Sequence, residues 1–554
     1  MEQSRVLLAI ALSFLVFFLW SVFFAKTPVP PPPSEQSTQE NPAETIPYNQ
    51  PETTTPSTES IIQPSVASIP PMPVDRTARQ LEINTPLYRI EISEQGAVFT
   101  SYVLKDYTET IDADSPLKEL IQQDNGNGML QLLSGNPLLG GLEQGIFVAD
   151  TDESTISVSD TERSIAFQWI SSQGIVVEKQ FTFFPNSYLI DLDLTIINQS
   201  DQVFQEEVAL DLTNKRDANQ KSFGFQGPSA LIDGKITQIK EKKIKEKDTY
   251  AGMIKWISIQ DQYFISSLIL DTATDAKMKI SLVDDIWHSQ MVFPAAVVSP
   301  GTQRTYENKL FIGPKSIRIL KQIDGELDKA VDFGWFKFIA IPCLYIMNFV
   351  YGFIPNYGIA IIILTIMTKL LLWPLGNKSY KSMNDMKKIQ PLMADLRERY
   401  KDDKKRMNQE LMGLYKAYKI NPMGGCLPMV LQIPVFFALY RMLYQAIELR
   451  HAPFMLWIND LSAPDRLFSF DFSIPFMQAP YGIPVLTIIM GASMLLQQKM
   501  SPPPGDPAQA KMMMIMPVVF TFIFINFSSG LVLYWLVSNL FSMAQQFYIQ
   551  KKYA

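Results

Sequence analysis

Cysteine and histidine are rare in this chain. Its 554 residues include two cysteines, Cys343 and Cys426, and two histidines, His288 and His451. Both cysteines lie in apolar stretches, so no disulfide framework is expected. The histidines are far apart and have no cysteine neighbours, whereas a zinc site needs three or four clustered ligands. The sequence therefore predicts neither a metal site nor a cofactor.

The chain also lacks the short motifs of common enzyme classes. No G-x-G-x-x-G, G-K-S/T or G-x-S-x-G segment occurs that would bind phosphates or activate a serine. Asp191 and Asp193 are two residues apart and would share one face of a strand, and a solvated face explains them better than a catalytic carboxyl pair. The chain is therefore not expected to be an enzyme.

Charged residues make up only 19% of the chain, and long uncharged runs lie near both ends. Residues 6–25 would form a helix of about 30 Å, enough to cross the hydrocarbon core of a bilayer. A signal peptide cut after Ala25 would need a small residue at the position of Phe23. Residues 1–26 are therefore predicted to be an uncleaved membrane anchor.

Two regions of different texture follow the anchor. Residues 27–80 are rich in Pro, Ser, Thr, Glu and Gln and have no apolar periodicity, which is typical of an extended linker. Residues 81–325 contain short alternating runs typical of strands, such as YRIEIS from Tyr88 and YLIDLDLTI from Tyr188. Many such strands with little helix predict an all-β sandwich domain.

The C-terminal part, residues 357–554, is predicted to cross the membrane five times. The first span contains Lys369, and the others lie at 423–447, 482–500, 512–527 and 529–549. The span at 512–527 would be only about 24 Å long, which implies local thinning of the bilayer.

The loop at 377–421 sets the orientation of these spans. It holds twelve Lys or Arg residues, so the positive-inside rule places it in the cytoplasm, as it does the lysine-bearing C-terminus. If the anchor starts in the cytoplasm and the β-domain lies outside, one crossing before this loop is the simplest solution. Residues 326–356 should then form an amphipathic helix in the membrane interface.

The same loop has its own helical pattern. Apolar residues recur at helical spacing on both sides of KDDKK at 401–405, which predicts a cytoplasmic helical hairpin. The charges of this loop are mixed in sign, and few aromatic residues lie between them. Direct nucleic-acid binding is therefore less favoured than contact with solvent or lipid headgroups.

Lys369 is a charged residue inside an apolar run, IIILTIMTKLLLWPL. A lysine at the centre of a span costs about 2.5 to 3.5 kcal/mol on insertion scales. No acidic residue in the five predicted C-terminal spans could neutralise it, so water is the expected partner, in a hydrated groove. Other polar residues in the spans could line this groove or tie helices together: Thr365, Gln432, Ser538, Asn539, Gln545 and Gln546.

Several segments resemble the YidC/Oxa/Alb family of membrane protein insertases. They include NPMGGCLPMVLQIPVFFALYRML at 421–443 and SSGLVLYWLVSNL at 528–540, within the same order of anchor, linker, β-domain, interfacial helix and core. The resemblance implies a polytopic α-helical protein of the bacterial inner membrane, with six spans, both termini in the cytoplasm and a periplasmic β-domain. It also implies a water-filled groove that is open to the cytoplasm and to lipid.

The resemblance further implies partners and site residues. Nascent membrane proteins would be the clients, handled alone or with the Sec translocon, and the hairpin would meet the ribosome or the signal recognition pathway. The family usually has arginine at the position of Lys369 and often tyrosine at that of Trp535. The groove residues it implies are Lys369, Thr365, Gln432, Tyr534, Trp535, Ser538 and Asn539. The client-exit face it implies consists of Met429, Ile433, Pro434 and Phe436.

Two other functions stay open on the residues alone. An ion- or solute-coupled transporter would be expected to show intramembrane carboxylates or an inverted repeat, and neither is visible. An envelope assembly scaffold would leave Lys369 without a role. The favoured interpretation is an insertase and chaperone for integral membrane proteins.

The orientation can be tested by labelling single cysteines in a chain whose native cysteines have been replaced. A cysteine at Ser382 should react only from the cytoplasmic side, whereas cysteines at Ser222 and Asp460 should react from outside. Reaction of position 382 from outside would mean that residues 326–356 cross the membrane, because the parity of the crossings would change.

Overall fold

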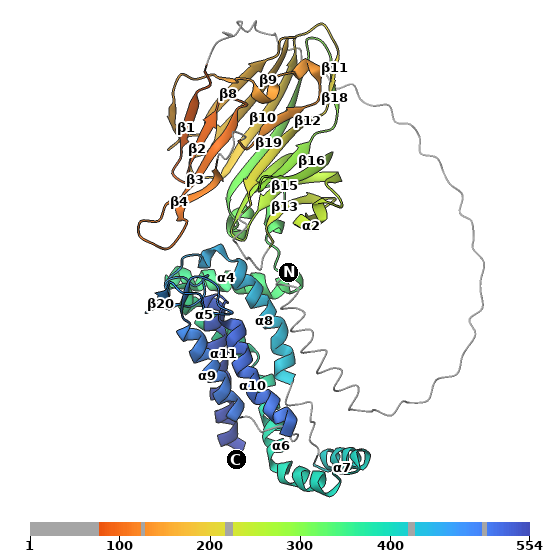
Figure 1. Ribbon diagram of the computed structural model, residues 1–554, viewed down its shortest axis with the longest axis vertical. Coiled ribbons are helices and arrows are strands. Elements are labelled where there is room, and N and C mark those ends of the chain that lie inside the picture. Colours follow the sequence, from red (N-terminus) through yellow and green to blue (C-terminus); the bar gives the residue numbers. More distant parts are fainter. Residues whose placement is uncertain (1–76, 123–127, 217–224, 419–426, 501–506, 554) are drawn as a thin grey trace, which may run out of the picture. The chain divides into compact units, whose positions relative to one another are not determined.

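The computed structural model describes residues 77–122, 128–216, 225–418, 427–500 and 507–553. The predicted anchor at 1–26 and nearly all of the predicted linker at 27–80 lie outside these residues. The described chain begins with a strand-rich region and continues with a helical region (Figure 1).

Two sheets build the strand-rich region, which is called the β-domain below. The smaller sheet has the order β4-β3-β2-β1-β7. Its strands are β1 (Gln80–Asn84), β2 (Tyr88–Ser93), β3 (Val98–Thr108), β4 (Leu117–Gln122) and β7 (Thr155–Ser157). All its pairings are antiparallel except the parallel pairing of β1 with β7.

The larger sheet follows the order β14-β13-β15-β16-β19-β10-β9-β8-β6, with β12, β17 and β5 attached off this path. Its strands are β5 (Gln131–Ser134), β6 (Val148–Ala149), β8 (Arg163–Ile170), β9 (Ile175–Phe183), β10 (Leu189–Asn198), β12 (Val208–Lys215), β13 (Gly227–Ile232), β14 (Lys235–Gln238), β15 (Thr249–Gln260), β16 (Phe264–Val283), β17 (Ile286–Val292) and β19 (Gln303–Pro314). The remaining short elements are η1 (Pro137–Leu139), η2 (Leu142–Gln144), α2 (Glu241–Ile244) and the pair β11 (Phe204–Glu206) and β18 (Ala296–Val298).

Alternating side chains explain why these segments form a sandwich. In β10 the apolar residues Ile190, Leu192 and Leu194 are buried, whereas Asp191 and Asp193 lie on the half-exposed face. The strands predicted from Tyr88 and Tyr188 are confirmed as β2 and β10. Both sheets bury their apolar faces in one hydrophobic core, which contains Tyr88, Phe99 and Tyr102 of the smaller sheet and Phe181, Trp256 and Phe311 of the larger.

An ion pair closes one edge of this core. The carboxylate of Glu94 has no exposed surface, and it accepts hydrogen bonds from the Arg79 guanidinium at 2.8 and 3.1 Å. The backbone amides of Arg79 and Ala149 also donate to it, at 2.9 and 3.3 Å. Burial alone would raise the pKa of Glu94, but these hydrogen bonds outweigh it and hold the pKa below its ordinary value.

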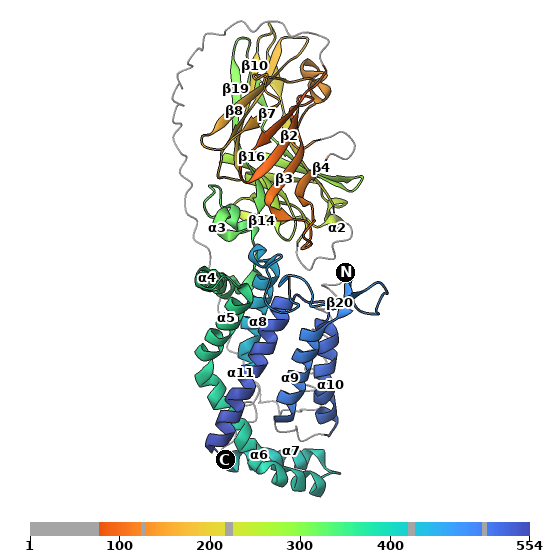
Figure 2. The ribbon, with the colours of Figure 1, turned by 90° about the vertical axis from the view of Figure 1, so that its left-hand side faces the viewer.

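The helical region begins after β19. Its helices are α3 (Ile317–Leu320), η3 (Leu327–Ala330), η4 (Gly334–Phe336), α4 (Lys337–Phe353), α5 (Tyr357–Leu371), α6 (Trp373–Arg399), α7 (Lys404–Ala417), α8 (Leu427–Gln445), η6 (Ile447–Leu449), α9 (Val485–Met500), α10 (Pro507–Phe524) and α11 (Ser529–Tyr553). A small hairpin of β20 (Leu467–Phe470) and β21 (Tyr481–Ile483) precedes α9. Helix α11 packs against α5, α6, α8 and α9 and shares a second hydrophobic core with α4 (Figure 2).

The helices of this region differ in whether they are long and apolar enough to cross a membrane. Within the described residues, one continuous helix, Gly334–Phe353, is long enough and apolar enough to cross a membrane. Helices α5 and α6 would form a second such segment if this bent pair is counted as one span. The apolar helices Val485–Met500 and Lys511–Phe524 are shorter. By length and hydropathy alone Gly334–Phe353 could cross a membrane, so its interfacial position stays a prediction, as does the number of spans.

The predicted helical hairpin is confirmed as α6 and α7. The side chains of Ile389, Met393 and Leu411 are buried between the two helices. Asp403 caps the second helix, because its carboxylate accepts a hydrogen bond from the Arg406 amide at 3.0 Å. The hairpin helix α6 begins already at Trp373, directly after the bend that ends α5.

Replacing Arg79 by Met should destabilise the β-domain. Removing one partner of a buried ion pair costs about 3 kcal/mol of the free energy of unfolding, because the other charge stays buried. Since the pKa of Glu94 is lowered by folding, its contribution exists above its unfolded pKa and is lost as the pH falls through its folded pKa. The difference from wild type should therefore shrink below about pH 4.

The measurement is denaturant unfolding of the detergent-solubilised chain at pH 7 and pH 3.5. Arg163→Met on the exposed end of β8 is the matched control and should change stability by less than about 0.5 kcal/mol. An equal loss for both variants, or a loss that does not depend on pH, would contradict the assignment.

Candidate functional site

Helix α5 carries Lys369 to the end of an apolar segment. Asn356 caps the start of the helix, because its side-chain oxygen accepts a hydrogen bond from the Ile359 backbone amide at 3.1 Å. Its buried face includes Ile361, Leu364 and Thr365. Trp373 and Pro374 then begin α6 at 65° to α5, since proline has no amide hydrogen to continue the first helix. Lys369 therefore lies in the last turn before the bend.

Neutral side chains hold the Lys369 ammonium. Its Nζ atom donates to Gln432 Oε1 of α8 at 3.1 Å and to Ser542 Oγ of α11 at 2.9 Å. The Lys369 side chain is half-buried, and no ion pair within the described chain includes it. The sequence alone indicates water as the partner of Lys369, and the structure adds two acceptors, one from α8 and one from α11.

Gln432 connects three helices at this point. Besides accepting from Lys369, its amide donates to Ser538 Oγ of α11 at 2.9 Å, and its side chain also hydrogen-bonds with Tyr534. Tyr534 and Ser538 therefore both hydrogen-bond with Gln432 and, through Gln432, are connected to Lys369. Together with Ser542 these residues are called the Lys369 cluster.

Three other predicted groove residues have different contacts. Thr365 is fully buried, and its hydroxyl donates to the Ile361 carbonyl of its own helix at 2.6 Å. The Asn539 amide donates to Ser493 Oγ of α9 at 3.1 Å, so Asn539 ties α11 to α9. Trp535 packs against Phe436, with ring centroids 4.7 Å apart, and also against Phe520 and Phe524.

The predicted client-exit face lies on α8. Ile433, Pro434 and Phe436 are half-buried there, and Phe436 joins the aromatic contacts of Trp535. Met429 belongs to the same helix, but its side chain lies outside the described residues.

Two residues of the site were not assigned from the sequence. Ser542 accepts from Lys369, and the Tyr380 hydroxyl of α6 hydrogen-bonds with Ser542. Gln545, a polar residue of the last predicted span, donates to the Trp373 carbonyl at 3.1 Å and to Asn377 Oδ1 at 3.0 Å. Tyr534, Ser538, Ser542 and Gln545 are spaced by four, four and three residues, so helical periodicity alone could have placed them on one face.

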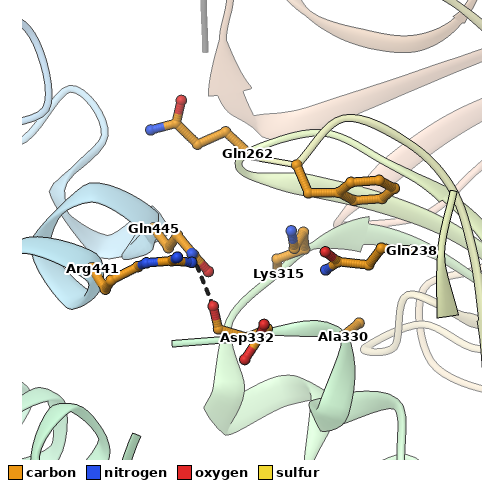
Figure 3. A pocket seen from close by; sticks show the side chains of 8 residues that line it. Gln238, Gln262, Lys315, Ala330, Asp332, Arg441 and Gln445 are labelled. Atoms are coloured by element: carbon orange, nitrogen blue, oxygen red, sulfur yellow. Dashed lines mark hydrogen bonds between the residues drawn. The ribbon is translucent and has the colours of Figure 1, made fainter. Parts of the chain in front are cut away.

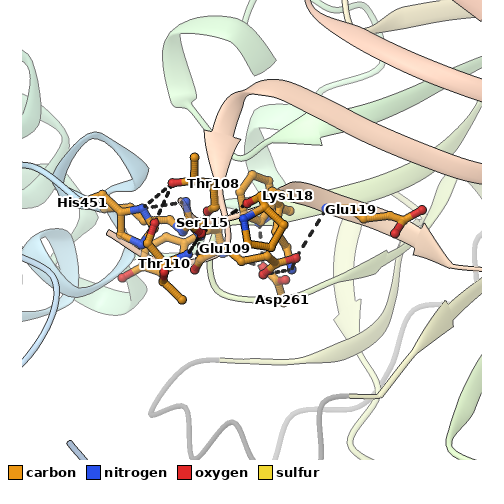
Figure 4. Close-up of polar contacts among 12 residues, drawn as sticks. Thr108, Glu109, Thr110, Ser115, Lys118, Glu119, Asp261 and His451 are labelled. Atoms are coloured by element: carbon orange, nitrogen blue, oxygen red, sulfur yellow. Dashed lines mark hydrogen bonds and ion pairs between the residues drawn. The ribbon is translucent and has the colours of Figure 1, made fainter. Parts of the chain in front are cut away.

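A second set of polar contacts joins the loop after α8 to the β-domain (Figure 4). The Arg450 guanidinium donates to the carbonyls of Thr108 and Glu109 at 2.6 and 3.3 Å. His451 lies beside Thr108, with 3.4 Å between Nδ1 and Oγ1. Burial and the neighbouring Arg450 lower the pKa of His451, so its ring is neutral at pH 7.

A small pocket lies near these contacts, between α8 and the β-domain (Figure 3). Gln238, Gln262 and Lys315 line one side, and Arg441 and Gln445 line the other. Lys315 Nζ donates to the Asp261 carbonyl at 2.8 Å, and burial lowers the pKa of Lys315 to about 8. Among the described residues, no three His, Cys, Asp or Glu side chains gather as possible metal ligands.

Comparison with known proteins identifies the family. Residues 80–346 match the model of the YidC periplasmic domain, and residues 349–554 match that of the 60Kd inner membrane protein. The membrane protein insertase YidC of Syntrophus aciditrophicus is 40% identical over 563 residues, covering 99% of this chain and 100% of that protein. The chain belongs to the YidC family. The insertase YidC of Syntrophobacter fumaroxidans is 38% identical over 564 residues, with 99% and 100% covered.

Solved structures of the YidC family are also similar to this chain. A crystal structure of an active YidC insertase, with its first transmembrane domain resolved, is 17% identical. The match covers 86% of this chain and 93% of that one, with a TM-score of 0.37. The β-sandwich described above is the periplasmic domain of this YidC family member.

Double-mutant cycles should separate the two kinds of polar contact. Lys369 and Gln432 should couple by about 0.6 to 1.7 kcal/mol, the range for hydrogen bonds between membrane helices. Asn539 and Ser493 should couple by a similar amount, whereas Lys369 and Asn539 should couple by less than about 0.3 kcal/mol because they share no partner. Unfolding of leucine or alanine variants in micelles measures these energies. Strong coupling of Lys369 to Asn539 would contradict the separation.

Proposed function

We propose that this chain inserts integral inner-membrane proteins and helps them fold, and that the Lys369 cluster receives the polar part of a client. The observation that carries the proposal is a cation in an apolar helix that donates hydrogen bonds to uncharged acceptors on two other helices. Family membership supports the activity and the multi-pass location in the inner membrane.

The proposed topology has six spans. These are the N-terminal anchor followed by α5, α8, α9, α10 and α11, with both termini and the α6–α7 hairpin in the cytoplasm. The short span predicted at 512–527 belongs mainly to α10, which begins earlier, at Pro507, and has 18 residues, about 27 Å at the usual rise. Helix α9 has 16 residues, about 24 Å, which is shorter than a typical hydrocarbon core of about 30 Å. Short helices favour a locally thinned bilayer beside the cluster.

The physical problem for an insertase is the polar tail of its client. Each unsatisfied polar group that enters hydrocarbon costs several kcal/mol. A hydrated groove that reaches part of the way across, in a thinned bilayer, shortens the path over which this cost applies. Lys369, Gln432, Ser538 and Ser542 would offer donors and acceptors along that path.

Lys369 would act on acidic tails in particular. Its hydrogen bonds to Gln432 and Ser542 are to neutral acceptors, and a client carboxylate would form a stronger, charge-assisted hydrogen bond. Replacing Gln432 or Ser542 by a client carboxylate as the acceptor is therefore favourable, and the ammonium stays hydrogen-bonded throughout. The apolar part of the client would then leave along Ile433, Pro434 and Phe436 of α8.

The remaining functional assignments are proposals that rest on the absence of enzyme motifs from the sequence and on the resemblance described above. We propose that the chain performs no enzymatic reaction and needs no cofactor. We also propose that it works alone or with the Sec translocon, and that the α6–α7 hairpin meets lipid headgroups and the ribosome or signal recognition pathway. Direct nucleic-acid binding is not part of the proposal, because the hairpin charges are mixed in sign.

Substitution of Lys369 tests the proposed role. Lys369→Arg should preserve insertion, because arginine keeps its charge even when partly desolvated. Lys369→Leu should remain folded, since it removes a charge that costs about 2.5 to 3.5 kcal/mol within a span. It should insert acidic-tailed clients poorly and neutral-tailed clients nearly normally, because only the acidic tail loses its Coulomb partner.

Insertion into liposomes is compared for two clients that differ only in tail charge, at equal levels of each variant. Lys378→Leu is the matched control, because Lys378 is an exposed lysine on α6 nine residues further along the chain. If Lys369→Leu and Lys378→Leu treat the two clients alike, the electrostatic role of Lys369 is refuted.

A further inference from the structure

The segment between α8 and α9 presents an unusual set of exposed aromatic residues. Residues 467–484 are called the phenylalanine hairpin here, and they contain one charged residue, Asp471. Phe468 is 69% exposed, Phe472 64% and Phe476 86%. Large exposed apolar patches mark surfaces that contact a partner or a membrane.

The backbone of this hairpin is held firmly in place. The Arg466 guanidinium donates to the carbonyls of Pro480 and Ile525 at 2.8 and 2.9 Å. The Asn526 side chain accepts from the Gln478 amide at 2.8 Å and donates to the Phe476 carbonyl at 2.7 Å. The hairpin is thereby fastened to the turn between α10 and α11. The phenylalanine side chains therefore project from a fixed backbone.

The backbone angles of Phe468 and Phe476 also indicate that the hairpin is held in a fixed conformation. Phe468 and Phe476 have φ angles of 55° and 66°, in the left-handed region that aromatic residues rarely adopt. Such conformations persist only where the surrounding structure determines them, and they often accompany functional surfaces. In this hairpin the two residues concerned are also highly exposed.

The exposed aromatic surface continues an apolar surface of the core. Strand β21 leads directly into α9, where Ile488 and Ile489 are exposed, and α10 ends near the hairpin with Phe522 and Ile523 exposed. Figure 2 shows β20 at the end of α9 and α10 that the hairpin joins. In a multi-pass membrane protein, exposed apolar side chains on such helices contact lipid.

We propose that the phenylalanine hairpin inserts into the periplasmic leaflet of the inner membrane beside α9 and α10. Its occupant is the lipid acyl region just below the headgroups, which suits exposed aromatic rings, while Asp471 can stay at the headgroup level. Because Arg466 and Asn526 fasten the hairpin to the α10–α11 turn, this contact would set the depth of α11 and hence of Ser538 and Ser542. The inference depends on the proposed span orientation but not on insertion activity.

The test measures the depth of one side chain in liposomes. A nitroxide label is attached to Phe476→Cys in the full chain after replacement of Cys343 and Cys426, and its collisions with oxygen and with a water-soluble nickel chelate are compared. Matched labels at Phe522 on α10 and at the exposed Ser159 of the β-domain define the lipid and water limits. Labels at positions 468 and 472 repeat the accessibility measurement in case the substitution at position 476 disturbs the hairpin.

The proposal expects the label at 476 to resemble that at 522, with high oxygen and low nickel accessibility. A label that resembles position 159 would overturn it. Protection from both reagents only when a client is bound would also overturn it, because the hairpin would then be a client contact. These readings do not involve Lys369, so they are independent of whether its substitution changes insertion.

Discussion

The Lys369 ammonium lies in a helix whose neighbouring side chains are almost all apolar, and the polar contacts of the Lys369 cluster are organised around its hydrogen bonds. Gln432 and Ser542 supply acceptors from α8 and α11, which requires these helices to approach the end of α5. Ser538 and Tyr534 in turn satisfy Gln432. A neutral amide and a hydroxyl hold a cation without cancelling its charge, so the site keeps an attraction for carboxylates that an ion pair would have removed.

Helix α11 makes different kinds of contact with each of the helices around the Lys369 cluster. Trp535 packs on Phe436, Phe520 and Phe524, one residue away from Tyr534 on α11. Asn539 and Ser493 tie α11 to α9 on another face. Helix α11 thus carries a polar face toward α5 and α8, an aromatic contact toward α10 and a hydrogen bond toward α9. Separate contacts, at Arg450 and at Arg466, hold the loops that follow α8.

Sequence patterns predict the local structure well and the contacts less well. Alternation identified strands such as β2 and β10, and helical spacing identified the α6–α7 hairpin, because both depend on neighbouring residues. Lys369 and Gln432 stand out as polar residues in apolar runs. Ser542 does not, since a serine is inconspicuous in a span and its role depends on an approach of α11 to α5. Asn539 was predicted as a groove residue, but its hydrogen bond to Ser493 ties α11 to α9.

Water access to the Lys369 cluster is the central claim, and a thiol probe tests it most directly. Ser542 and Ser493 are both buried, with 7% and 4% of their surface exposed. Ser542 on α11 lies beside Lys369, whereas Ser493 on α9 lies beside Asn539. Each is replaced by cysteine in a chain without Cys343 and Cys426, and a charged, water-soluble thiol reagent is applied from the cytoplasmic side. The account predicts that position 542 reacts, that bound client slows the reaction, and that position 493 stays unreactive. Absence of reaction at 542, or equal reaction at both positions, would contradict a hydrated groove at Lys369.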